Sequence, residues 1–453
     1  MNSPQAKSPP NWTLIACAVF ALFILLAIVT GRGLYADGSL YFLMVLKAGG
    51  FAPIIPCRDF ATYVFQLPMA AALKLGINHI PWLIPFFGVG CFYAWPVAML
   101  LCYRLASRHF WLVMLACAAG YLNTAFMAVG EHIVAHAFFW PALFAILFVR
   151  PLTPFAAGSL LLSGFILMRS YESYLFLGPL LTGLVVWRMV RDQERPWRQA
   201  VLAAAAACFV LAAYFAWKSV AHANARNYNS FKQGLFEQLA APVWTVKMSF
   251  WWGLFMGGMM FPPIAKALKL PVAWILIVLF VLIWGAWPIL APAQLHPGLQ
   301  YNCRFLDLLV PLALTPVAML LAFKPNWLAA QTPDLRRLSA IMLVAQSLWH
   351  ISATYQWQRT ISSWKHLLAE KDGPIFLPRD RCFNDPDYSW ANPCVSLLVG
   401  PERVRAMIMP DHSELWQPFD WLKPSTFPDL KRYGVDYTEY VDALNREKLN
   451  HDR

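Results

Sequence analysis

Long apolar runs alternate with short charged segments along residues 1–355. A membrane helix needs about 20 mostly apolar residues, and this length selects about eleven candidates. They are 12–30, 80–103, 110–129, 132–149, 152–169, 173–190, 199–219, 246–264, 271–290, 305–323 and 338–354. The pattern therefore predicts an all-α polytopic membrane protein.

Residues 31–79 do not fit this scheme. Their apolar stretches, 40–48 and 60–75, are too short to span a bilayer and are interrupted or flanked by charges and prolines. We expect two amphipathic helices lying on the membrane surface in the first outer loop.

The composition becomes charged and proline-rich after Tyr355. We therefore expect two parts, a transmembrane domain over 1–355 and a small α+β extramembrane domain over 356–453. Within the second part, 374–377 and 395–399 are candidate strands and 438–448 a candidate helix.

The composition supports a membrane partner. Hydrophobic residues make up 59% of the chain and charged residues 13%, with a mean hydropathy of +0.49, which excludes an ordinary soluble globule. The net charge of +12 is scattered between apolar segments. Because nucleic-acid binding proteins concentrate such charge on one face, a nucleic-acid partner is not expected.

The basic residues also predict the topology. If the N-terminus is cytoplasmic, the predicted cytoplasmic loops carry the main arginine clusters, as the positive-inside rule requires. Those clusters include Arg104, Arg108, Arg150, Arg188, Arg191, Arg195, Arg198, Arg336 and Arg337. The first apolar run is too long for a signal peptide and has no small-residue cleavage site, so we expect it to stay as a helix. An odd number of spans places the C-terminal part on the opposite, periplasmic or extracellular side.

Seven of the nine cysteines lie in or beside apolar segments, where cysteine behaves as a small hydrophobe. Cys382 and Cys394 are the two in the polar tail. We predict that they form a disulfide, which also indicates an oxidising compartment.

The first candidate for chemistry is Asp37, directly after the first apolar run. A carboxylate at this edge of the membrane could act as a general base. Alternatively, Asp37 and Gly38 form a turn that caps the following helix.

Two further clusters occur at predicted outer edges. Arg58 and Asp59 could form a simple ion pair, or Arg58 could bind a phosphate. Glu131 and His132 begin a helix on which His136 follows at i,i+4 from His132. That spacing permits a metal site, but without an identifiable third ligand a polar cavity lining is favoured.

A fourth cluster joins two outer helix ends. One carries Arg169, Tyr171 and Glu172, and the other carries Arg304. The two arginines could neutralise a phosphate or diphosphate leaving group. Either could instead be an interfacial arginine that extends its side chain to the membrane surface.

Together these features resemble the GT-C superfamily of membrane glycosyltransferases over about residues 12–355. The resemblance rests on Asp37 after the first helix, two surface helices in the first outer loop, the acidic residue Glu131 in the second, and the run Arg304 to Pro311. The order of these features and their position on one face carry the resemblance.

The resemblance implies a bacterial inner-membrane enzyme that moves a sugar, with inversion, from a polyprenyl-phosphate donor to a glycan, lipid or protein acceptor. Asp37 would be the base, and Arg58, Arg169 and Arg304 would hold the lipid phosphate. Gly38 and Ser39 follow Asp37, so the paired acidic motif of metal-dependent members is missing. A divalent metal is therefore not assigned, nor is any other cofactor. A transporter or flippase of a lipid-linked or anionic substrate is the main alternative, and a noncatalytic assembly factor is a third.

Overall fold

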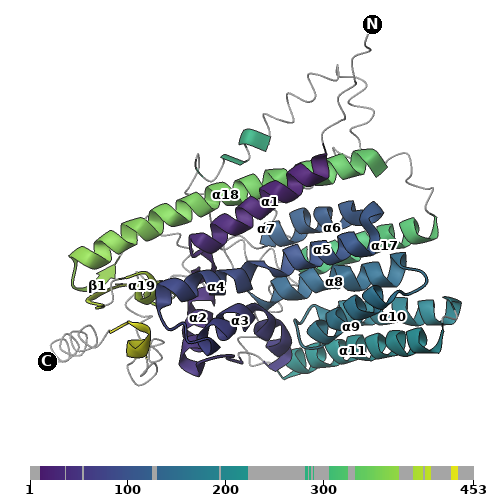
Figure 1. Ribbon diagram of the computed structural model, residues 1–453, viewed down its shortest axis with the longest axis horizontal. Coiled ribbons are helices and arrows are strands. Elements are labelled where there is room, and N and C mark those ends of the chain that lie inside the picture. The colour runs from purple at the N-terminus through teal and green to yellow at the C-terminus, as the bar shows by residue number, and fades with distance from the viewer. Residues whose placement is uncertain are drawn as a thin grey trace, which may run out of the picture.

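The computed structural model describes residues 11–35, 37–53, 56–124, 130–192, 195–222, 281–283, 285–286, 289, 306–324, 332–376, 391–400, 403–409 and 430–436. This part of the chain is mainly helical (Figure 1). Four of its helices are long and apolar enough to cross a membrane, or five if a bent pair counts as one span. The class of structure is therefore that of a helical protein with several candidate membrane spans. The total of eleven spans stays a prediction, because 246–264 and most of 271–290 lie outside the described residues.

Most helices begin and end close to the predicted positions. The long bundle helices are α1 (Trp12–Val29), α8 (Glu131–Phe148), α9 (Pro154–Met168), α10 (Tyr174–Asp192), α11 (Pro196–Ala221) and α17 (Leu306–Phe323). Buried residues occupy α8 along almost its whole length, so α8 is the centre of the bundle. It contacts α3, α5, α9, α10 and α17.

The predicted helix 80–103 is wrong as one straight span. It forms α4 (Ile80–Phe92) and α5 (Ala94–Ala106), which meet at a bend of 43°. Pro96 explains the break, because a proline ring clashes with the carbonyl four residues earlier, here that of Phe92.

The predicted helix 110–129 is also irregular. After η3 (Ser107–His109) it forms α6 (Phe110–Ala116), one π-helical turn η4 (Cys117–Tyr121) and α7 (Leu122–Thr124). Such π-turns interrupt the regular ladder of hydrogen bonds and are frequent at functional sites.

The two helices expected in the first outer loop are present. They are α2 (Asp37–Ala48) and α3 (Asp59–Lys74), preceded by the short turns η1 (Arg32–Leu34) and η2 (Pro56–Arg58). Both bury one face, and α3 packs on α4, α8 and α9. At Gly90 a side chain would collide with the Phe65 carbonyl, so this glycine permits the close approach of α3 and α4. Their position on a membrane surface stays a prediction.

The last long helix, α18 (Thr332–Glu370), continues beyond the predicted end at residue 354. It lies beside α1 along the bundle (Figure 1). Arg32, which is fully buried, joins the two where α1 ends. Its Nη1 donates to the His350 carbonyl and to Thr354 Oγ1, at 3.1 and 2.9 Å, and its Nη2 lies 2.7 Å from His350 Nδ1.

The C-terminal part contains a two-stranded parallel sheet of β1 (Gly373–Phe376) and β2 (Ala406–Met409), followed by η10 (Leu430–Tyr433). The predicted strand 395–399 is wrong, since these residues belong to helix α19 (Asn392–Val399). Pro393 suits a first helical turn, and successive residues of the helix are buried, which an alternating strand would not require. The predicted helix 438–448 lies outside the described residues.

Candidate functional site

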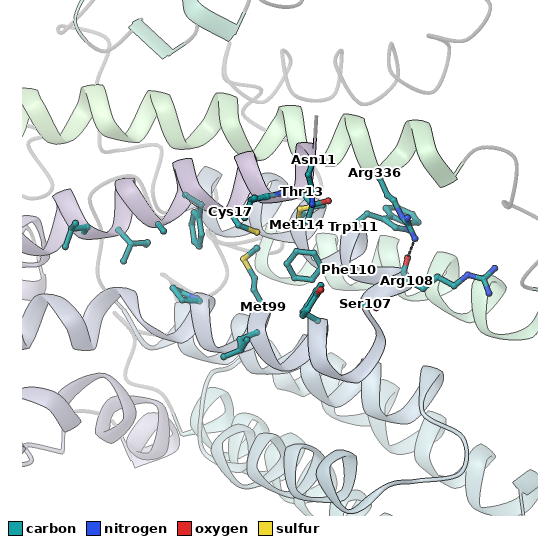
Figure 2. Close-up of a pocket in the computed structure, with 18 of the residues that line it drawn as sticks. Asn11, Thr13, Cys17, Met99, Ser107, Arg108, Phe110, Trp111, Met114 and Arg336 are labelled. Atoms are coloured by element: carbon teal, nitrogen blue, oxygen red, sulfur yellow. Dashed lines mark hydrogen bonds between the residues drawn. The ribbon is translucent and has the colours of Figure 1, made fainter. Parts of the chain in front are cut away.

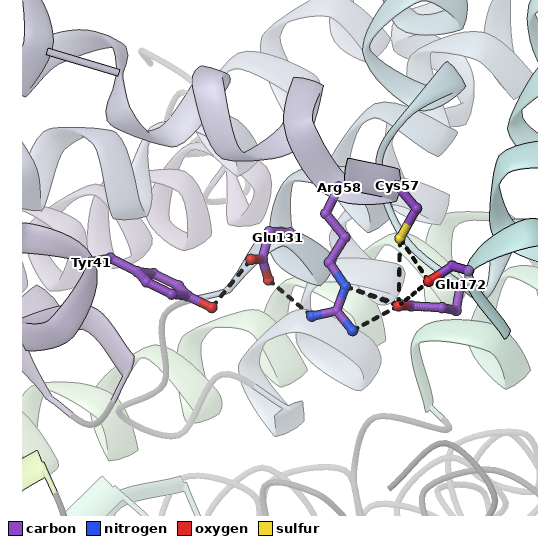
Figure 3. Close-up of polar contacts among 6 residues, drawn as sticks. Tyr41, Cys57, Arg58, Glu131 and Glu172 are labelled. Atoms are coloured by element: carbon purple, nitrogen blue, oxygen red, sulfur yellow. Dashed lines mark hydrogen bonds and ion pairs between the residues drawn. The ribbon is translucent and has the colours of Figure 1, made fainter. Parts of the chain in front are cut away.

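Arg58, in the turn η2 before α3, lies between two carboxylates (Figure 3). Its Nε donates to Glu172 Oε1 and Oε2 at 3.0 and 3.1 Å, and its Nη2 donates to Glu172 Oε1 at 2.8 Å. Its Nη1 lies 3.5 Å from Glu131 Oε2. Glu131 is the first residue of α8, and Glu172 lies between α9 and α10. Arg58, Glu131 and Glu172, which are far apart in sequence, therefore form one charged cluster.

The charges in this cluster stabilise each other. Burial alone would raise the pKa of Glu172, but the charge and hydrogen bonds of Arg58 outweigh it and hold that pKa below its ordinary value. Burial likewise opposes the charge on Arg58, and Glu172 and Glu131 raise its pKa well above the ordinary value. Arg58 and Glu172 are therefore both charged at neutral pH.

Tyr41 connects this cluster to α2. Its hydroxyl donates to Glu131 Oε1 at 3.1 Å. Asp37 is the half-buried first residue of α2 and stands four residues before Tyr41. Residues at i,i+4 share one face of a helix, so Asp37 lies one turn from the residue that binds Glu131.

A second ion pair lies beside the first. Asp59 Oδ2 is 3.1 Å from Arg169 Nη1. The Arg169 carbonyl accepts from the backbone N–H groups of Phe60 and Ala61, at 3.0 and 3.3 Å, which joins the end of α9 to the start of α3. Arg58 and Asp59 therefore pair with different partners, although they are neighbours in sequence.

Arg169 is the more accessible of the two cations. Its side chain is 28% exposed, compared with 17% for Arg58, and among the described residues it makes one ion pair where Arg58 makes two. Burial raises the pKa of Asp59, and Arg169 opposes that rise only in part. Arg169 is thus the cation better placed to accept an additional anion.

Aromatic rings complete the cluster. The Arg58 guanidinium lies 4.7 Å from the centre of the Tyr171 ring, and the His132 ring lies 5.7 Å from the same ring. The buried His136 lies 5.3 Å from the Trp95 ring. A side chain on Gly120, in the π-turn η4, would collide with the His136 ring. The irregular turn therefore makes room for this histidine.

Sequence reasoning missed two members of the cluster. The Cys57 thiol donates to Ser219 Oγ at 3.0 Å and lies 3.6 Å from Glu172 Oε1. Ser219 Oγ is 3.4 Å from the same oxygen and brings in α11. Burial, followed by the charge of Glu172, raises the pKa of Cys57 to about 12, so the thiol is not a nucleophile. Cys57 precedes Arg58 and could have been noticed, whereas nothing in the sequence marks Ser219.

Two of the predicted site residues, Arg304 and Cys382, lie outside the described residues. Cys394 is described. Its buried thiol is not part of a disulfide in the structure and forms a hydrogen bond with the Ser39 side chain. Burial raises the pKa of this thiol. The predicted disulfide stays a prediction.

In the described part of the chain, no group of three or more His, Cys, Asp or Glu residues is arranged to hold a metal ion. The comparisons with protein families, curated proteins and solved structures found no match to this chain. The GT-C resemblance therefore stays a prediction.

Proposed function

We propose that this chain is a membrane glycosyltransferase that moves a sugar from a polyprenyl-phosphate donor to an acceptor hydroxyl or amine, with inversion. One observation carries the proposal: Arg58, Glu131, Glu172, Asp59 and Arg169 converge at one end of a helical bundle. Chemistry at one face requires such a concentration, whereas a transport path would need ionisable groups distributed across the membrane.

In the proposed step the acceptor oxygen or nitrogen attacks the anomeric carbon of the sugar. The bond between that carbon and the phosphate oxygen breaks, and polyprenyl phosphate leaves as an anion. Asp37 takes the acceptor proton, which balances the reaction without a further reactant. A cation near the leaving phosphate stabilises its charge in the transition state.

The geometry divides the roles of the two described arginines. Glu172 and Glu131 already occupy three donor nitrogens of Arg58. A phosphate on Arg58 would have to displace a carboxylate, so Arg58 is proposed to position Glu131 and Glu172. Arg169, which is partly exposed, is proposed to bind the phosphate together with Arg304. Tyr171 and His132 then line the acceptor side of the cluster.

The test is transfer from a panel of polyprenyl-phosphate sugars by the purified full-length protein, followed by kinetics of an Arg169→Met variant. A hydrogen bond between charged groups is worth about 1.5–3 kcal/mol, so kcat/KM for the donor should fall about 10-fold to 100-fold. Arg337→Met is the matched control, because Arg337 is a surface cation paired with Asp334. Absence of transfer from every donor, combined with movement of a lipid-linked sugar across liposomes, would support the transporter alternative instead.

A further inference from the structure

An apolar groove runs along α1, and no residue of the charged cluster lines it (Figure 2). One wall is α1 from Asn11 to Ile28, and the other is formed by α5 and α6. Its volume is about 950 Å³, near the upper end of the roughly 300–1,000 Å³ range typical of small-molecule sites. Leu14, Leu25 and Leu100, which are more than half exposed, line it. The groove therefore opens to the surroundings of the bundle along an apolar surface.

The groove matches the dimensions of a membrane. The 18 residues of α1 extend about 27 Å, since each residue of an α-helix rises 1.5 Å. The hydrocarbon core of a bilayer is about 30 Å thick. A chain-like apolar ligand could thus lie along α1 inside the hydrocarbon layer.

The mouth of the groove is basic. Arg108, in the turn η3 after α5, and Arg336, near the start of α18, lie there beside the first residues of α1. Figure 2 shows Arg336 above the mouth, where its Nη2 donates to the Arg108 carbonyl at 3.0 Å. None of the residues that line the groove is acidic, and within the described part of the chain neither guanidinium makes an ion pair.

The neighbouring His109 does not add to this charge. Burial and the two arginines lower its pKa to about 4, so its ring is neutral at physiological pH. The ring stacks on Phe148 at 4.2 Å between centres. The positive charge at this end of the groove therefore comes from Arg108 and Arg336, which have no carboxylate partner in the described part of the chain. Figure 2 shows the Arg108 side chain extending away from Arg336.

We propose that this groove binds one anionic glycerophospholipid, with its phosphate headgroup on Arg108 and Arg336 and an acyl chain along α1. Charge complementarity identifies the occupant: an apolar channel that ends at two cations without a carboxylate partner among the described residues fits a ligand with an apolar chain and an anionic head. Anionic lipids attract basic residues at a membrane surface, and each cation contributes about fivefold in affinity. The site is independent of the sugar-transfer proposal.

The experiment measures how much lipid remains bound to the purified full-length protein in native mass spectrometry. Phosphatidylglycerol is compared with phosphatidylcholine, which has the same chains and no net charge. The wild type should retain one phosphatidylglycerol in preference to phosphatidylcholine. The Arg108→Gln variant should lose about fivefold of that preference. It keeps the bond from Arg336, because the acceptor is the backbone carbonyl.

Two other variants complete the design. Arg337→Gln makes the same charge change on the residue next to Arg336, and because Arg337 is paired with Asp334 it should bind like the wild type. Ala21→Phe places a ring in the groove and should reduce retention of both lipids. Size-exclusion profiles check that each variant is folded.

Equal retention of the two lipids by the wild type would overturn the proposal, as would unchanged preference in Arg108→Gln. Retention of a polyprenyl phosphate, but not of phosphatidylglycerol, would also overturn it and would assign the groove to that lipid.

Discussion

The Arg58 guanidinium holds the Glu172 carboxylate with three hydrogen bonds of 2.8–3.1 Å, although 114 positions separate the two residues. This contact joins the turn before α3 to the loop before α10. Glu131, the first residue of α8, lies on the other side of the same guanidinium. A single cation therefore holds the carboxylates of Glu131 and Glu172, which lie at the starts of α8 and α10.

Removal of Arg58 should therefore destabilise the fold strongly. Arg58→Met leaves Glu131 and Glu172 buried without their cation, and breaking such a pair costs about 3–5 kcal/mol. The double variant Arg58→Met with Glu172→Gln should lose less than the sum of the single losses, since one of the two carboxylates left without a cation, that of Glu172, is gone. Thermal unfolding in detergent of the wild type, Arg58→Met, Glu172→Gln and the double variant measures these losses. Strictly additive losses would show that the two residues act independently.

The same ion pair predicts how stability responds to acid. The folded-state pKa of Glu172 is below its ordinary value of 4.5, so its contribution is present above about pH 4.5 and is lost as the pH falls through the lowered pKa. Glu172→Gln should therefore flatten the fall of Tm as the pH drops below about 4.5.

Asp59→Asn is the comparison, because the pKa of Asp59 is raised. A carboxyl with a raised pKa contributes no stability that is lost on acidification, so this variant should keep the acid sensitivity of the wild type. Equal flattening in both variants would contradict the assignment to Glu172.

The π-turn gives a prediction about packing. Gly120→Ala should push the His136 ring out of its position and destabilise the protein by about 1–3 kcal/mol, the usual cost of overpacking. Gly158→Ala in α9 has open space around it and should be neutral or slightly stabilising. The difference in Tm between the variants measures the effect. If both behave alike, the contact with His136 is not a tight one.

The buried Arg32 predicts a difference between arginine and lysine. Its two terminal nitrogens bond three acceptors on α18, and a lysine amine cannot reproduce that planar arrangement. Arg32→Lys should therefore lower stability by about 1–3 kcal/mol despite the unchanged charge. Arg405→Lys, at an exposed position, provides the control. Equal Tm values for the two variants would show that the hydrogen bonds of the Arg32 guanidinium do not stabilise the contact with α18.

The sequence predicted most helices, because long apolar runs leave few alternatives to a helix in a membrane. It also predicted that Arg58, Glu131, Arg169 and Glu172 lie on one side of the membrane, since alternation of the spans fixes the side on which each loop emerges. The structure brings these residues together at helix ends, and their side of the membrane stays a prediction. It could not predict that Arg58 pairs with Glu172 and not with its neighbour Asp59. That choice depends on how the helices pack.

Two errors have local causes. The short apolar run 395–399 fits a strand or a buried helix equally well by pattern, and only its packing decides. The bend between α4 and α5 follows from Pro96, because a proline interrupts a helix even where the apolar run 80–103 is continuous.

We propose that Asp37 is the base in a sugar-transfer reaction. The most direct measurement is the transfer rate of Asp37→Asn, with donor binding measured separately. We expect the rate to fall about 100-fold to 10,000-fold while the donor still binds, because Asn keeps the shape of Asp but cannot take the proton. Asp334→Asn, a surface carboxylate in α18, should transfer at the wild-type rate. Transfer by Asp37→Asn at the wild-type rate would contradict the account.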